Sequence, residues 1–158
     1  MIIGIGSDLA NIKRIEKTIE KFGDRFINKI FSDYEIWESS RRKRLSSKEY
    51  ASSLAKRFAA KEACSKALGT GLRQGVFWKN MEIKHEVTGK PNMVLSGGAL
   101  ERLNKIMPEG YSPNILVTMT DDQPWAQAFV IIEAVKDWFN IQNIDNEVNY
   151  KRKIKSYE

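Results

Sequence analysis

The segment that follows residue 45 constrains the fold more than any other part of the sequence. Ser46 and Glu49 have the Ser-x-x-Glu spacing of a helix capping box, and Gly69 stands where a helix would end. Between them, several alanines allow close packing, and larger apolar side chains build one side of the segment. These side chains are Tyr50, Leu54, Phe58 and Leu68. The sequence therefore predicts one long helix over residues 47–68.

Shorter segments on both sides of this helix have the character of β-strands. Two glycines interrupt the first of them, and a polar turn at residues 121–124 joins the last two into a hairpin. A second turn is expected at Gly89-Lys90-Pro91. The expected strands lie at residues 2–7, within 76–87 (as one or two strands), at 93–95, at 115–120 and at 125–133.

Three further helices are expected. Asn11 is a good N-cap for a helix that Gly23 ends, and Ser32 with Glu35 makes a capping box for a second helix. Apolar residues at helical spacing predict a third helix that ends before Pro108. The basic run at residues 41–44 is expected to be a solvated turn.

Composition excludes several classes of protein. A single Cys rules out a disulfide framework, and a single His argues against a metal site built from several His ligands. No apolar run approaches the ~20 residues of a membrane span, and the first residues lack the features of a signal peptide, so a cytoplasmic protein is expected. The net charge of +6 favours an anionic partner, whether nucleic acid, a phosphate-rich small molecule or an acidic protein.

Two carboxylates and a lysine are the strongest candidates for chemistry. Asp8 is expected just after the first strand, and Glu62 and Lys66 share one side of the long helix. Two carboxylates that leave positions open suit Mg²⁺ bound together with a substrate phosphate, while the lysine would neutralise phosphate oxygens. Spacing alone also fits an ordinary stabilising pair between Glu62 and Lys66. The glycines that follow, Gly69 and Gly71, fit either the end of a helix or a close approach of the backbone to phosphate.

The first helix carries a basic outer face. Such a face is most often simply solvated, but the local excess of cations also suits an acidic partner surface. His85 is interpreted as an exposed strand residue without a catalytic role, and Cys64 as a buried, inert thiol. The basic residues are Lys13, Arg14, Lys17 and Lys21, with Arg25 and Lys29 further on.

Four motifs together resemble the holo-[acyl-carrier-protein] synthases, which are small bacterial phosphopantetheinyl transferases. The motifs span residues 2–133, and the first two are specific as a pair. They are IGIGSDL at residues 3–9, followed by Ile12, Arg14 and Ile15; RFAAKEA at 57–63, running into KALGTG at 66–71; Gly89-Lys90-Pro91; and TMT at 118–120 with WAQA at 125–128.

The resemblance implies an activity, a fold and roles for residues. It implies Mg²⁺-dependent transfer of 4'-phosphopantetheine from coenzyme A to a serine of apo acyl carrier protein, in fatty acid biosynthesis. Asp8 and Glu62 match the metal ligands, Lys66 matches a basic residue near the phosphates, and Glu62 is a candidate to accept the serine proton. Other positions match the coenzyme pocket (Gly69, Gly71, Gly89, Lys90 and Pro91) and the surface for the carrier protein (Arg14, Lys17, Lys21 and Arg25).

The implied fold is α+β, with an antiparallel sheet packed on a long central helix, in a homotrimer whose sites lie between subunits. The domain would cover residues 1–139, and residues 140–158 would be a polar extension. Asp121 stands where family members often have His, so a phosphate contact of that His does not transfer. Two alternatives stay open: a non-catalytic nucleic-acid binder, motivated by the charge, and the same reaction on a carrier protein of polyketide or peptide synthesis.

Overall fold

The computed structural model describes residues 1–44 and 46–136, which form an α+β fold around a single long helix. A three-stranded antiparallel sheet has the order β1-β5-β4, and a separate antiparallel pair joins β2 and β3. The strands are β1 (Ile2–Asn11), β2 (Met81–His85), β3 (Pro91–Leu95), β4 (Tyr111–Asp122) and β5 (Trp125–Lys136). The helices are α1 (Ile12–Phe22), α2 (Asp24–Ile30), α3 (Asp33–Lys43), α4 (Ser47–Ala67) and α5 (Gly97–Ile106), with a 3-10 turn, η1 (Trp78–Asn80).

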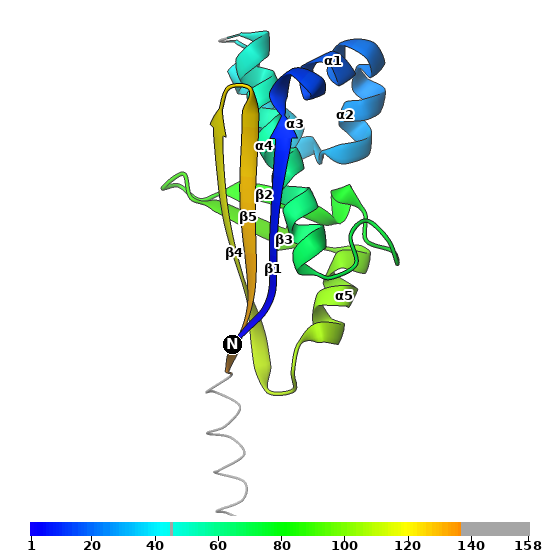
Figure 1. Cartoon of the computed structure of the whole chain (residues 1–158), viewed down its shortest axis with the longest axis vertical. Coiled ribbons are helices and arrows are strands. Elements are labelled where there is room, and N and C mark those ends of the chain that lie inside the picture. The colour runs from blue at the N-terminus through cyan, green and yellow to red at the C-terminus, as the bar shows by residue number, and fades with distance from the viewer. Residues whose placement is uncertain (45, 137–158) are drawn as a thin grey trace, which may run out of the picture.

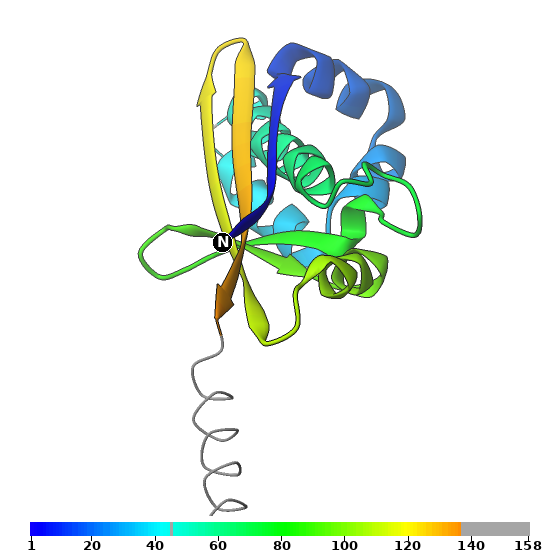
Figure 2. The same ribbon diagram turned by 60° about the horizontal axis from the view of Figure 1, so that its bottom comes forward.

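Helix α4 is the centre of the molecule, as the sequence predicts. The Ser46 hydroxyl accepts a hydrogen bond from the Glu49 amide, so Ser46 is the N-cap. The helix lies behind the three-stranded sheet in Figure 1, and the opposite face of that sheet has no helix over it. Figure 2 shows the same layering, with α1 and α2 beyond one end of the sheet and the β2–β3 hairpin crossing below α4. The predicted antiparallel sheet on a long helix is confirmed.

Two glycines of β1 allow the strand to touch the backbone of α4. A Cβ atom at Gly4 would come within 2.2 Å of the Ala67 carbonyl oxygen, and one at Gly6 within 1.9 Å of the Ala63 oxygen. No side chain fits at such distances, so only glycine permits this contact. The glycines therefore serve strand-to-helix packing, which goes beyond the role of exposing Asp8 that the sequence suggests.

The predicted helix boundaries at the N-terminal end are confirmed. The Asn11 side chain accepts from the Arg14 amide at 3.0 Å, and Gly23, with a φ of 53°, ends α1. Ser32 and Glu35 form the expected reciprocal capping box at the start of α3. The expected succession of strand, turn and strand is also present, with a single strand, β2, inside 76–87. Gly89 and Lys90 lie in the connection, whereas Pro91, expected in the turn, is the first residue of β3.

Four predictions differ from the structure. Helix α2 was not expected, since it has no side-chain N-cap, although Ile27 and Ile30 bury one of its faces. Residues 41–43 form the last turn of α3 rather than a solvated turn, and β4 continues through Asp121 and Asp122, so only two residues connect it to β5. Strand β1 runs beyond residue 7 to Asn11, because it keeps pairing with β5 as far as Trp125.

Part of the predicted domain boundary lies outside the described residues. The expected domain ends at residue 139 and the expected polar extension covers 140–158, whereas the description of the chain stops at residue 136. None of the helices in the described ranges is long and apolar enough to cross a bilayer.

Candidate active site

A cavity of about 420 Å³ lies where β1 meets α1, α2 and α4. It brings together Asp8 from β1 and Glu62 from α4, which are 54 positions apart in the sequence. Arg14 at the start of α1 also lines it, and Phe58 and Phe26 give it apolar walls. The sequence-based expectation that the two carboxylates share one site is therefore consistent with the fold.

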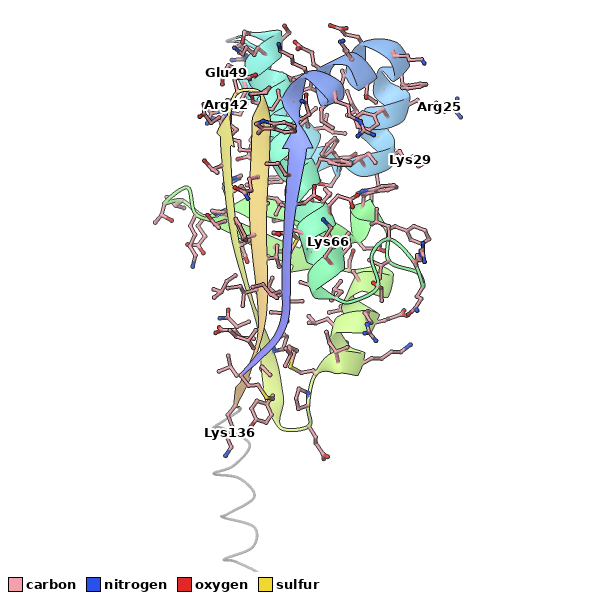
Figure 3. All side chains as sticks on the ribbon, viewed as in Figure 1. Arg25, Lys29, Arg42, Glu49, Lys66 and Lys136 are labelled. Carbon is pink, nitrogen blue, oxygen red and sulfur yellow. The ribbon has the colours of Figure 1, made fainter. Side chains whose placement is uncertain are left out.

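Asp8 lies inside strand β1, opposite Ala128 of β5, and not just after the strand as expected. Its Oδ1 atom accepts a hydrogen bond from the Lys66 ammonium at 2.8 Å, and the same ammonium donates to the Ser7 carbonyl at 2.9 Å. The Lys66 side chain is 51% exposed and that of Asp8 18%. Lys66 extends from the lower part of α4 beside β1, where solvent and ligands can reach it (Figure 3).

Glu62 lies one helical turn before Lys66 on α4. Its Oε1 atom accepts a hydrogen bond of 2.8 Å from the indole Nε1 of Trp78, in η1. The pairing of Glu62 with Lys66, which spacing alone allowed, is not formed, because Lys66 is bonded to Asp8 instead. Trp78 was not singled out from the sequence, and no spacing rule identifies an indole donor from another segment.

The chemistry of this site suits a divalent cation with phosphate. In the described part of the chain, no group of three or more Asp, Glu, His or Cys residues gathers at a metal-binding distance. Two carboxylates facing one cavity fit Mg²⁺, which takes one or two carboxylates and completes its octahedron with water and substrate phosphate. Lys66, which is paired with Asp8, would then neutralise further phosphate charge.

The loop after α4 has the conformation that its glycines predict. Gly69 and Gly71 have φ values of 75° and 58°, and the Gly71 amide donates to the Ser65 carbonyl. Arg102 of α5 donates to the Leu68 carbonyl at 2.9 Å and so ties α5 to the end of α4. Neither glycine lines the cavity of Asp8 and Glu62.

The remaining predicted pocket residues belong to a second cavity, of about 470 Å³. Gly89 and Pro91, at the turn between β2 and β3, line it, whereas Lys90 lies exposed in the same turn. Asp121 also lines this second cavity, where Lys56 contacts it at 2.6 Å. Lys56 thus neutralises the carboxylate that stands at the usual His position, and Asp121 does not line the cavity of the first site.

His85 also lines the second cavity and is half-buried, not exposed as expected. Its Nδ1 atom lies 3.1 Å from Glu38, and Glu38 also pairs with the guanidinium of Arg57. The Arg57 Nε atom is buried and, among the described residues, has no hydrogen-bond partner. This cavity therefore holds cationic groups that its own carboxylates only partly satisfy.

The predicted basic surface divides between two helices. Arg14 lines the first cavity, while Lys17 and Lys21 line an adjoining hollow of about 670 Å³ on α1. Arg25 is exposed on α2, pointing away from the sheet in Figure 3. Arg14, Lys17 and Lys21 thus line two neighbouring hollows, and Arg25 lies outside both of them.

Lys61 is a structural residue that sequence reasoning missed. Its ammonium is fully buried and bonds to Glu35 at 2.8 Å and to the carbonyl oxygens of Trp78 and Met81. Burial lowers the pKa of Lys61, and the contact with Glu35 opposes that shift. Its spacing of seven from both Leu54 and Leu68, two core residues, was a signal that this lysine lies on the buried side.

Cys64 is buried, as the sequence predicts. Desolvation raises the pKa of its thiol to about 12. Since the thiolate is the nucleophile, a thiol with such a pKa is inert near neutral pH.

The chain is similar to known proteins over most of its length. The sequence profile of the 4'-phosphopantetheinyl transferase superfamily matches residues 4–115. The holo-[acyl-carrier-protein] synthase of Sinorhizobium fredii is 58% identical over 135 residues, which cover 85% of this chain and 94% of that protein.

Solved structures give the same result. The crystal structure of holo-[acyl-carrier-protein] synthase from Neisseria meningitidis matches with a TM-score of 0.70 at 36% identity, over 84% of this chain and 99% of the other. The Helicobacter pylori synthase in complex with coenzyme A matches with a TM-score of 0.67 at 28% identity, over 82% and 99%. The chain therefore belongs to the 4'-phosphopantetheinyl transferase superfamily.

Proposed function

We propose that this protein transfers 4'-phosphopantetheine from coenzyme A to a serine of apo acyl carrier protein and releases adenosine 3',5'-bisphosphate. The observation that carries the proposal is that Asp8 and Glu62 line one cavity and that Lys66 pairs with Asp8, in a chain 58% identical to a holo-[acyl-carrier-protein] synthase. The coenzyme A complex of the Helicobacter pylori relative supports the choice of donor. Fatty acid biosynthesis is the pathway we expect it to serve.

The reaction exchanges one phosphorus–oxygen bond for another. The serine oxygen bonds to the β-phosphorus, the bond from that phosphorus to the bridging oxygen breaks, and the bisphosphate leaves with the electron pair. Asp8 and Glu62 would hold Mg²⁺, which when bound supplies Lewis-acid polarisation and charge neutralisation at the pyrophosphate. Lys66 would stabilise the phosphate oxygens, and Glu62, directly or through water, would accept the serine proton.

The two cavities suggest how the coenzyme is shared between subunits. Gly89 and Pro91 line the second cavity, apart from Asp8 and Glu62, and Lys90 is exposed between them in the sequence. A homotrimer in which the second cavity of one chain adjoins the first cavity of the next would join them. Arg42 lines the second cavity and would supply a cation for coenzyme phosphate, and Gly69 and Gly71 would approach the nucleotide from the chain that carries Glu62.

The outer face of the three-stranded sheet supports self-association. Ile5 is 67% exposed there and Phe129 44%, and Leu9, Leu116 and Trp125 are also exposed. Figure 1 views this face, which the helices leave uncovered. We expect light scattering to give the mass of three chains for the wild type and the mass of one chain for Phe129→Glu. A monomeric wild type would exclude the trimer.

The first prediction concerns Glu62. Glu62→Gln keeps the shape of the side chain and removes its charge, so we expect loss of Mg²⁺-dependent transfer with an unchanged fold. The assay incubates protein, coenzyme A, Mg²⁺ and apo acyl carrier protein, and mass spectrometry detects the added phosphopantetheine. Glu101→Gln, on the exposed side of α5, is the matched control and should retain full transfer. Undiminished transfer by Glu62→Gln would remove this residue from the mechanism.

The second prediction concerns the carrier-protein surface. Arg14, Lys17, Lys21 and Arg25 would dock the acidic carrier, so Arg14→Glu should weaken carrier binding about tenfold at low salt, mostly through slower association. Lys105→Glu makes the same charge change on exposed α5 and should have no effect. Equal carrier affinity of Arg14→Glu and wild type at low salt would contradict the docking role.

The identity of the carrier protein is tested by the same assay. Apo carrier domains of polyketide or peptide synthesis, offered in place of the fatty-acid carrier, show whether the client is of that kind. For the nucleic-acid alternative, Arg41 and Arg42 belong to α3, where Arg41 lies over the Trp37 ring and Arg42 lines the second cavity. Salt-dependent binding to random duplex without binding of coenzyme A would favour that alternative. We expect the reaction in the cytoplasm, a compartment that keeps thiols such as Cys64 reduced.

A further inference from the structure

A tryptophan outside the four family motifs of the sequence contacts the carboxylate at the centre of the proposed site. The indole Nε1 of Trp78 donates to Glu62 Oε1 at 2.8 Å. An indole N–H is a donor only, so this contact occupies one of the two carboxylate oxygens and leaves the other for a different partner. Trp78 itself is not among the residues that line the cavity.

Trp78 is held from two sides by residues that the mechanism does not use. Its carbonyl oxygen accepts from the buried Lys61 ammonium at 3.0 Å, and Lys61 is paired with Glu35. The ring is half-buried against the core cluster of α1, α2 and α4, and the Lys29 ammonium lies 5.9 Å from the ring centre. Since Lys61 and Glu62 are adjacent on α4, one residue fixes the Trp78 backbone while the next receives its side chain.

We infer that Trp78 is a positioning residue for Glu62: its indole holds one carboxylate oxygen and thereby reserves the other for the divalent cation. The inference rests on the proposed function. Groups that hydrogen-bond to a metal ligand fix its orientation, and their loss typically costs 10–100-fold in metal affinity or activity. Trp78→Phe keeps an aromatic ring for packing and removes the donor.

The test measures metal binding directly. Mn²⁺ is titrated into the full-length protein at saturating coenzyme A, and free Mn²⁺ is measured by electron paramagnetic resonance, with a blank of coenzyme alone. We expect Trp78→Phe to raise the half-saturating Mn²⁺ concentration about tenfold. Trp37→Phe is the matched control, because Trp37 is exposed on α3 and contacts Tyr34 and Arg41 instead of the site.

Activity separates positioning from general damage. We expect Trp78→Phe to raise the half-saturating Mg²⁺ concentration for transfer by the same factor, while kcat at saturating Mg²⁺ and the KM for carrier protein change little. A structural defect would lower kcat at every Mg²⁺ concentration and leave Mn²⁺ affinity unchanged, which would overturn the inference. If the wild type transfers no phosphopantetheine, the proposed function fails, whereas an active wild type with equal Mn²⁺ affinity in Trp78→Phe refutes only the role of Trp78.

A measurement on the wild type keeps the inference testable if Trp78→Phe does not fold. The four tryptophans give four indole N–H signals in a ¹⁵N spectrum, and Phe variants at the other three positions assign the signal of Trp78 by elimination. We expect this signal to shift when Mg²⁺ and coenzyme A are added, while that of Trp37 stays in place. A Trp78 indole signal whose chemical shift does not change on addition of Mg²⁺ would overturn the inference.

Discussion

Two of the lysine–carboxylate pairs that helix α4 forms have equal lengths and opposite environments. Lys61 and Glu35 lie 2.8 Å apart and both side chains are fully buried. Lys66 and Asp8 also lie 2.8 Å apart, but the lysine is half exposed. Five positions along one helix therefore separate a pair closed to solvent from one open to it.

The hydrogen bonds of the two ammonium groups explain what each pair is suited to do. Lys61 uses its three N–H donors on Glu35, Trp78 and Met81, so it joins α4 to α3 and to the start of β2. Lys66 contacts Asp8 and one carbonyl, and water can replace either partner. A buried pair with every donor used maintains architecture, whereas an exposed pair can exchange its partner for a substrate phosphate.

Breaking the buried pair should give the largest effect. Lys61→Met leaves the Glu35 carboxylate buried without its counter-charge, and loss of one partner in such a pair costs about 3–5 kcal/mol. Urea denaturation measures the free energy of unfolding. The double variant Glu35→Gln with Lys61→Met removes both charges and should recover much of the loss. A single variant as stable as wild type would show that the pair is dispensable.

Breaking the exposed pair should affect transfer instead of stability. Lys66→Met should lower kcat about 100-fold if Lys66 stabilises charge in the transition state. The free energy of unfolding should change by less than about 1 kcal/mol, as for other exposed pairs. Steady-state transfer and urea denaturation on the same preparation measure both quantities. A large loss of stability in Lys66→Met with a normal kcat would show that Lys66, like Lys61, has a structural role.

The buried side of α4 also predicts a smaller effect of pH. Burial raises the pKa of the Cys64 thiol from an ordinary value of 9.0 to about 12, so above pH 9 the unfolded chain loses this proton first. Stability therefore falls as pH rises, and by pH 10.5 this group alone removes about 2 kcal/mol. Cys64→Ala lacks this contribution, so its stability relative to wild type should improve by that amount between pH 8 and 10.5. Parallel pH profiles would contradict the raised pKa.

Local patterns predicted the helices well where a cap or stop residue was present. Asn11, Ser32, Ser46 and Gly23 all mark the ends at which the helices begin or stop. Helix α2 was missed because it has no side-chain cap and only seven residues. The length of β1 was underestimated because its polar end, with Asp8 and Asn11, is stabilised by pairing with β5, which local sequence does not reveal.

The site was predictable only where a motif carried it. The motifs around Asp8 and Glu62 led to residues that the fold brings to one cavity. The roles of Lys61 and Trp78 were not predicted. A lysine among alanines is typical of a solvated helix position, and an indole donor 16 positions from Glu62 has no periodic relation to it. The partition of the pocket residues between two cavities depends on the crossing of the β2–β3 hairpin below α4, a property of tertiary structure (Figure 2).

The glycines of β1 have a consequence for the chemistry as well as for the packing. Gly6 meets the Ala63 carbonyl, which is next in sequence to Glu62, and it stands two residues before Asp8. The backbone of β1 thus contacts the backbone of α4 close to Asp8 and Glu62, and no flexible side chain separates the strand from the helix at this point. A methyl group added at residue 6 would clash with the Ala63 carbonyl and push the strand away from the helix, so it would increase the distance between Asp8 and Glu62, the two residues that we propose hold the cation.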